Sequence, residues 1–168
     1  MLTGAGNRRF LERWFRDVAP QLEAAGSPLA FVMIDVDHFR RVNDVHGHAA
    51  GDAVLVALAQ LAMHHIRQGD AFARLGGEEF VIVLPDTTPA HAAQFCERLR
   101  GQIEALRIAL PGGGELSVTI SQGIAFAPPY ELSDLTARAD AAMYAAKRGG
   151  RNRVSADDGA QPSGPTGA

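Results

Sequence analysis

The sequence has few of the features that mark several large classes of protein. Only one of its 168 residues is a cysteine, Cys96, which excludes an internal disulfide and a cysteine-rich metal site. No apolar run reaches the ~18 residues that a transmembrane helix needs, and no signal peptide opens the chain. A lone thiol is compatible with a reducing compartment. We therefore expect a soluble, cytoplasmic domain that does not itself contact a membrane, whether it stands alone or belongs to a longer protein.

Positive charge is also not in excess. The chain has 16 Lys and Arg residues against 19 Asp and Glu residues, which gives a net charge of −3. A general nucleic-acid binder usually has a strongly basic face, so we do not expect nucleic acid as a partner. A small anionic ligand, held by a few cations and backbone amides, remains compatible with this charge.

What is present is ordinary for a globular domain. The hydrophobic content of 46% and the charged content of 21% are typical values. Helical spacing and short apolar runs predict helices over residues 7–22, 49–66, 89–108 and 132–147, and strands over residues 29–34, 70–75, 79–84, 117–120 and 123–127. This mixed order predicts an α+β domain with a mainly antiparallel sheet flanked by helices. We expect the domain to occupy residues 1–155 and residues 156–168 to form a disordered tail.

Two pairs of acidic residues adjoin the predicted strands. Asp35 and Asp37 follow the apolar run 29–34, and Glu78 and Glu79 follow Gly76-Gly77, which predicts a tight hairpin turn. If the first strand lies beside this hairpin, both acidic pairs meet at one edge of the sheet. Carboxylates there, helped by a backbone carbonyl, suit Mg²⁺ that shares phosphate ligands with a substrate. The alternative is that all four are solvated residues at strand ends.

A possible anion site follows the first strand. The segment from Asp37 to Arg40 is a short turn whose backbone amides could form an anion-binding nest. Arg40, Lys147 and Arg151 are candidate phosphate contacts because their cationic donors suit phosphate oxygens. Taken singly, each of the three is equally typical of a surface charge.

Six ordered motifs together resemble the GGDEF family of diguanylate cyclases, which join two GTP molecules into cyclic di-GMP. The resemblance runs from Leu2 to about Val154 and implies a palm-like fold of the nucleotidyl cyclases and polymerases, which is a ferredoxin-like arrangement. Its blocks are Leu2-Thr3-Gly4 with Asn7-Arg8-Arg9, Asp35 to Arg40 with Asn43-Asp44, Gly47-His48 with Gly51-Asp52, Gly76 to Phe80, Ala139-Asp140 to Lys147, and Gly150 to Arg153.

The resemblance implies a role for individual residues near the phosphates. Asp35, the carbonyl of Val36 and Glu78 would hold Mg²⁺ or Mn²⁺, and Glu78 would also accept the proton of the 3′-hydroxyl. Glu79 would be a second metal ligand or would shape the site. Arg40 stands where the family usually has Lys and would stabilise charge in the transition state.

The resemblance also implies the remaining substrate contacts. Asn43 and Asp52 would read guanine, because a carboxylate can accept from guanine N1–H and its amino group. For His48 the alternative is a histidine packed at the entry of a helix. The other expected substrate contacts are His38, Phe39, Lys147 and Arg151.

A regulatory motif lies just upstream of the hairpin. Arg67 and Asp70 form the RxxD pattern at the place of the family's product-inhibition site, with Arg98 as a further contact to cyclic di-GMP. The alternative for this common pattern is an exposed ion pair at a helix end.

The resemblance further implies partners and leaves other classes of function open. One domain would hold one GTP, so catalysis would need a homodimer, and an upstream sensory or receiver domain is expected outside this chain. The alternatives are a catalytically silent receptor for cyclic di-GMP, another palm-type nucleotidyl transferase, or an interaction module. The chain departs from the family at Glu78 and Arg40, which keep the charge of the usual residue, and at Gln122, where an apolar residue is usual.

Overall fold

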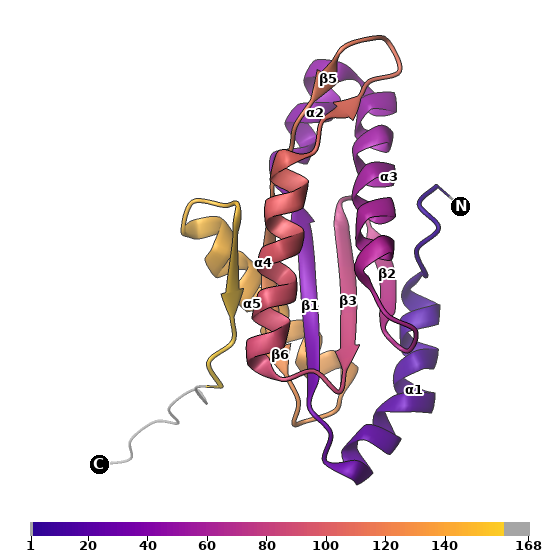
Figure 1. The fold of residues 1–168 in the computed structure, drawn as a ribbon, viewed down its shortest axis with the longest axis vertical. Helices are drawn as coiled ribbons and strands as arrows, with labels where there is room; N and C mark the ends of the chain where they lie inside the picture. The colour runs from indigo at the N-terminus through magenta and orange to yellow at the C-terminus, as the bar shows by residue number, and fades with distance from the viewer. Residues whose placement is uncertain (1, 160–168) are drawn as a thin grey trace.

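A computed structural model describes residues 2–159 of the chain, with one central sheet between two layers of helices (Figure 1). The elements follow in the order α1 (Arg8–Ala25), β1 (Leu29–Val36), α2 (Phe39–His46), α3 (His48–His65), β2 (Ala71–Gly76), β3 (Glu79–Pro85), α4 (Pro89–Ala105), β4 (Ile108–Ala109), β5 (Glu115–Leu116), β6 (Ile120–Phe126), α5 (Leu132–Arg148) and β7 (Arg153–Ala156). The predicted α+β class is therefore confirmed.

The main sheet has the strand order β2-β3-β1-β6-β7. Strand β1 lies in its centre and pairs antiparallel with both β3 and β6, while β2 and β3 form an antiparallel hairpin. Only β7 is parallel to its neighbour, β6. The prediction of a mainly antiparallel sheet is thus correct, and β4 and β5 form a separate small ribbon.

Helices cover both faces of the sheet, so β1 is buried along its whole length. Val32 and Ile34 point into a core shared with α3 and α4, and Phe31 and Met33 point into a second core shared with α1 and α5. Figure 1 shows α4 in front of β1 with α5 behind the sheet. This double burial explains why the β1 sequence is an uninterrupted apolar run rather than an alternating one.

Three elements differ from the sequence prediction. Helix α2 occupies a stretch for which the sequence predicts no helix, because Phe39 is the one residue of this short helix that is buried and the apolar signal is weak. The strands predicted over 117–120 and 123–127 are replaced by one strand, β6, which begins only at Ile120 and runs through the buried polar residues Ser121 and Gln122; residues 117–119 precede it. Helix α4 ends at Ala105, and Ile108 begins the short strand β4.

The C-terminal boundary is also different. Strand β7 includes Ala156, the first residue of the predicted tail. Beyond it, the amide of Asp157 donates to the carbonyl of Ile124 at 2.7 Å, and its carboxylate pairs with Arg138 at 2.8 Å. The prediction of disorder from residue 156 is therefore wrong for its first residues, and residues 160–168 lie outside the described part of the chain.

Candidate functional site

The β2–β3 hairpin places two glutamates at the edge of the sheet. Gly76 pairs with Glu79, so the turn is formed by Gly77 and Glu78, one residue later than predicted. An irregularity between Arg74 and Gly76 adds one residue to β2 and moves the turn. Gly77 has φ 51, in the left-handed region that favours glycine, and Arg74 donates to its carbonyl at 2.7 and 3.0 Å.

The acidic residues of β1 and β3 meet as expected. Asp35 is the direct cross-strand partner of Glu79, and the amide of Val36 donates to the carbonyl of Glu78 at 3.4 Å. Asp35 lies within the strand rather than just past it, because β1 extends to Val36. The predicted convergence of Asp35 with the hairpin glutamates is therefore confirmed.

Asp35 is a buried carboxylate in a charged environment. Its side chain is 6% exposed, and its Oδ2 lies 2.9 Å from Nζ of Lys147 on α5. Burial raises the pKa of Asp35 to about 6, Lys147 opposes this rise, and the negative charges of Glu78 and Glu79 add to it. Lys147, predicted as a phosphate contact, is thus held at this carboxylate.

The donor set fits a hard divalent cation. The negative charges of Glu78 and Glu79 both act on Asp35, and these side chains, with the backbone carbonyl of Val36, offer only oxygen ligands to a cation. Among residues 2–159, no three His, Cys, Asp or Glu side chains group closely enough to form a metal site by themselves. Mg²⁺ at a phosphate site needs only one or two protein carboxylates, since water and phosphate supply the rest.

Asp37 does not join this group. Its buried carboxylate accepts hydrogen bonds from the hydroxyls of Thr119 and Ser121 at 2.7 and 2.6 Å, and from the amide of Asn152 at 2.9 Å. The expectation that both Asp35 and Asp37 converge with the glutamates is therefore wrong for Asp37, whose oxygens are occupied by donors from the start of β6, the residue before it and the turn after α5.

The turn between β1 and α2 exposes both the first backbone amides of α2 and the cationic side chain of Arg40. His38 has φ 55 and caps α2 without a side-chain hydrogen bond, so the first amides of α2 have no side-chain partner there. Phe39 is buried in the core, whereas the side chain of Arg40 is 94% exposed and lies 3.8 Å from Asp44. The predicted phosphate turn is thus accessible, and Arg40 is free to move toward a ligand.

Helices α2 and α3 cross closely at Gly51. A Cβ at Gly51 would collide with Oδ1 of Asn43, so glycine leaves the room that the Asn43 amide occupies. Asp52 is the next residue of α3, and His48 is its first, and both are exposed. The structure therefore brings the predicted guanine-reading residues together at one helix crossing.

The RxxD residues line a separate cavity of about 300 Å³. Asp70 accepts from the backbone amide of Arg67 at 2.7 Å and from its guanidinium at 3.3 Å, which also donates to Thr87 at 2.9 Å. The guanidinium of Arg98 lies over the ring of Phe95, 5.9 Å from its centroid. The ion pair just after α3 is present, but the Asp70 side chain is 2% exposed rather than exposed as the alternative required, and Arg67, Asp70 and Arg98 all line one cavity.

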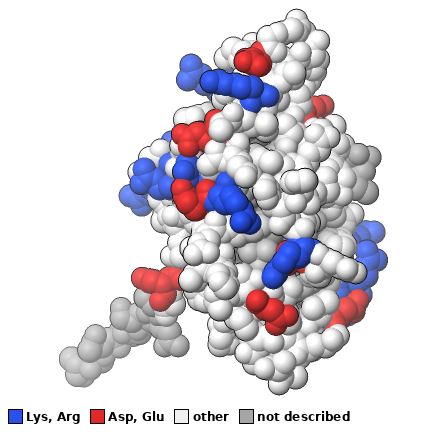
Figure 2. Space-filling view, viewed as in Figure 1, with Lys and Arg blue, Asp and Glu red and all other residues white. Residues whose placement is uncertain are grey.

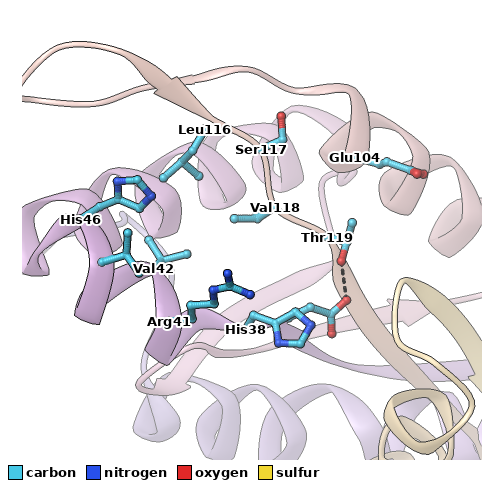
Figure 3. Close-up of a pocket in the computed structure, with 11 residues that line it drawn as sticks. His38, Arg41, Val42, His46, Glu104, Leu116, Ser117, Val118 and Thr119 are labelled. Atoms are coloured by element: carbon cyan, nitrogen blue, oxygen red, sulfur yellow. Dashed lines mark hydrogen bonds between the residues drawn. The ribbon is translucent and has the colours of Figure 1, made fainter.

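A second cavity, of about 440 Å³, lies on the side of α2 that faces β5 (Figure 3). Arg41 reaches into it from α2 toward Val118, and the dashed line in Figure 3 marks the bond from Thr119 to Asp37. No local sequence pattern indicates this cavity, because its walls come from two segments, residues 37–46 and 104–119, that lie far apart in the chain. On the face in Figure 2, cationic and acidic side chains are interspersed rather than gathered into one basic surface.

The fold and these groups together define a nucleotidyl-cyclase-like catalytic domain. Residues 1–153 match the family described as "Diguanylate cyclase, GGDEF domain", and the chain belongs to this family. None of the helices within residues 2–159 is long and apolar enough to cross a membrane.

Curated relatives are longer proteins. The chain is 42% identical to the uncharacterized protein YhcK of Bacillus subtilis, over 91% of this chain and 44% of that protein. It is 37% identical to the diguanylate cyclase DosC of Escherichia coli, over 92% of this chain and 34% of that protein. The chain therefore spans less than half the length of these relatives.

Solved structures of single domains match the whole fold. The GGDEF domain of DgcB from Caulobacter crescentus in complex with c-di-GMP has a TM-score of 0.89 and 32% identity, over 94% of this chain and 92% of that one. The active GGEEF domain of a diguanylate cyclase from Vibrio cholerae has a TM-score of 0.83 and 32% identity, over 92% and 99% of the two chains.

Proposed function

We propose that this chain is the catalytic domain of a diguanylate cyclase that condenses two GTP molecules into cyclic di-GMP and releases two pyrophosphates. The observation that carries the proposal is the placement of Asp35 opposite Glu79, with Glu78 in the adjoining turn and Lys147 2.9 Å away. Relatives named diguanylate cyclase support the reaction class.

Oxygen ligands for a divalent cation come from both strands. Asp35, the carbonyl of Val36 and Glu78 would hold Mg²⁺ or Mn²⁺, with Glu79 as a second ligand or a shaper of the site. The bound cation would supply positive charge against the triphosphate. The amides at the start of α2, with Arg40, Lys147 and Arg151, would hold the phosphate oxygens.

The chain's own groups would carry the proton and the developing charge. Glu78 would accept the 3′-hydroxyl proton of the opposing GTP while that oxygen attacks the α-phosphate in line and pyrophosphate leaves. Arg40 would stabilise negative charge in the transition state with a wider, less hydrated cation than lysine.

The crossing of α2 and α3 would read the base. Asp52 can accept from guanine N1–H and its amino group, Asn43 adds a side-chain amide, and His48 stands at the start of the same helix. Adenine lacks this donor pair, so an unpaired carboxylate would reject ATP by ~10⁴-fold, as other hydrogen-bond-selective sites do.

Because one domain offers one such site, the reaction would require a homodimer whose two sites face each other. Cyclic di-GMP would then inhibit its own synthesis through Arg67, Asp70 and Arg98, since two guanidinium groups border one cavity beside Asp70. A titration of pyrophosphate release with added cyclic di-GMP would measure this inhibition.

The reaction is tested by incubating the protein with GTP and Mg²⁺ and separating the nucleotides by chromatography. We expect cyclic di-GMP and two equivalents of pyrophosphate, and no dinucleotide from ATP. Binding of cyclic di-GMP by a protein that forms neither product would instead identify a silent receptor.

A further inference from the structure

We propose that Asp37 is a positioning residue that fixes Arg151 at the edge of the candidate active site. The inference rests on the proposed function, in which Arg151 contacts the triphosphate of GTP. Asp37 itself is 4% exposed, and both oxygens of its carboxylate accept hydrogen bonds from protein donors, so its effect must pass through another residue.

The turn after α5 has an unusual backbone. Arg151 has φ 64 and Asn152 has φ 46, so two successive residues other than glycine are in the left-handed region. Such conformations are unfavourable for residues with a Cβ, and a pair of them persists only where the surroundings hold it. The turn therefore needs anchors beyond its own sequence.

Asp37 is one of these anchors. Its Oδ2 accepts from the amide of Asn152 at 2.9 Å and from the hydroxyl of Thr119 at 2.7 Å, while Oδ1 accepts from Ser121 at 2.6 Å. The two hydroxyl donors, Ser121 in β6 and Thr119 just before it, hold the carboxylate in one orientation. A hydrogen bond from a backbone amide to a carboxylate is among the stronger ones.

The side chain of Asn152 provides a second anchor. Its Oδ1 accepts from Nη1 of Arg100 at 2.8 Å, and Arg100 is itself held by Glu97 at 2.6 Å and Glu104 at 2.7 Å. Helix α4 thus binds the side chain of Asn152, and the turn after β1 binds its backbone.

Asp35 in β1 and Asp37 just after it therefore hold both ends of one short segment. Asp35 binds Lys147 in the last turn of α5, and Asp37 binds Asn152 five positions later. Arg151 lies between these two points, and its amide donates to the carbonyl of Ala146 at 3.1 Å. Its exposed guanidinium has no ion pair within residues 2–159, so the donors are available to a ligand.

Loss of the Asp37 contact would leave the fold of the sheet intact but release this segment. Arg151 would then spend less time in reach of a phosphate, which weakens substrate binding more than the chemical step. We expect Asp37→Ala to raise the KM for GTP roughly tenfold, the usual effect of losing one hydrogen bond to a charged group, with a smaller change in kcat.

A double-mutant cycle distinguishes a role of Asp37 in positioning Arg151 from a general effect of Asp37 on the stability of the protein. KM and kcat are measured with GTP and Mg²⁺ for the wild type, Asp37→Ala, Arg151→Ala and the double variant. If Asp37 acts through Arg151, Asp37→Ala adds no further rise in KM once Arg151 is absent. Additive effects on KM, or an unchanged KM in Asp37→Ala, would overturn the inference.

Two further variants protect the test against misfolding. Asp37→Asn keeps an acceptor for Asn152 and Thr119, and its amide can donate to the Ser121 hydroxyl, so KM should recover most of the wild-type value. Asn152→Gly keeps the backbone amide that Asp37 binds, and glycine adopts the left-handed conformation without strain, so its KM should stay well below that of Asp37→Ala. A KM in Asn152→Gly as high as that of Asp37→Ala would contradict the proposal, because it would assign the anchoring to the Arg100 contact instead. A wild-type protein that makes no cyclic di-GMP would instead overturn the proposed function on which it rests.

Discussion

Asp35 on β1 and Glu79 on β3 are direct partners in the antiparallel pairing of two buried strands. The carboxylates proposed to act on the triphosphate therefore come from the sheet and its tightest turn rather than from long loops. Groups placed on such elements are held more exactly than groups on loops, which suits a reaction that depends on in-line geometry. Because the pairing of Asp35 with Glu79 fixes where these side chains lie, each single substitution at the site has a distinct expected effect that can be measured.

Glu78→Gln should lower cyclic di-GMP formation by ~10²–10⁴-fold, because the amide cannot accept the 3′-hydroxyl proton. The side chain keeps its size, so the thermal midpoint should change little. Glu78→Asp is the matched control, since it restores a carboxylate at the same turn and should retain activity. Full activity in Glu78→Gln together with a loss in Glu78→Asp would show that side-chain length at this position, rather than the charge, is what matters.

Asp35 and Lys147 should respond differently to substitution although they form one ion pair. Lys147→Ala leaves a buried carboxylate without its cation and should lower the free energy of unfolding by about 2 kcal/mol, between the values for exposed and fully buried pairs. Burial is the main cause of the raised pKa of Asp35, so the charged carboxylate is itself unfavourable in the folded protein. The Asp35→Asn variant loses this charge, and its free energy of unfolding without metal should therefore be near that of the wild type.

Urea denaturation in the presence of a chelator measures both effects, and the GTP assay shows whether each variant is active. We expect Asp35→Asn to be stable but inactive, because a neutral amide is a poor ligand for a hard cation. Equal destabilisation of the two variants would contradict the role of burial at Asp35.

Arg67→Ala should weaken inhibition by cyclic di-GMP at least tenfold, as expected for the loss of a hydrogen-bonded cation from an anion site. The initial rate without product should stay the same, since the cavity is separate from Asp35 and Glu79. Arg16→Ala is the matched control, because Arg16 is an exposed arginine paired only with the adjacent Asp17. Unchanged inhibition in Arg67→Ala would remove the RxxD site from the proposal.

The sequence was sufficient to predict the meeting of Asp35 with the hairpin glutamates. An uninterrupted apolar run identified the central strand, and Gly76-Gly77 marked a hairpin that could lie beside it. The exact turn was missed by one residue because the irregularity in β2 depends on pairing with β3, which has no local signature.

Other features could not be predicted because their causes are distant in the chain. The partners of Asp37 lie 82, 84 and 115 residues away, so no local pattern distinguishes it from Asp35. Strand β7 has four residues and owes its existence to parallel pairing with β6 after the chain returns along α5. Helix α2 is stabilised by its crossing with α3 at Gly51 rather than by an apolar stripe of its own.

Gln122 is the one departure from the family pattern that falls in the core. It is fully buried in β6, its Nε2 donates to the carbonyl of Cys96 at 2.9 Å, and within residues 2–159 its Oε1 has no hydrogen-bond partner. The carbonyl of Cys96 lies inside α4, where helical geometry also pairs it with the amide of Arg100. Loss of the Gln122 amide would therefore leave no buried group without a partner.

Gln122→Leu should accordingly raise the free energy of unfolding by about 1 kcal/mol, because it removes an unpaired buried acceptor and replaces it with apolar surface of similar volume. Urea denaturation measures the change, and Gln102→Leu on the exposed side of α4 is the control, with an expected change near zero. A loss of stability in Gln122→Leu would mean that Oε1 is paired in solution, most simply by a buried water that bridges it to a neighbouring polar group.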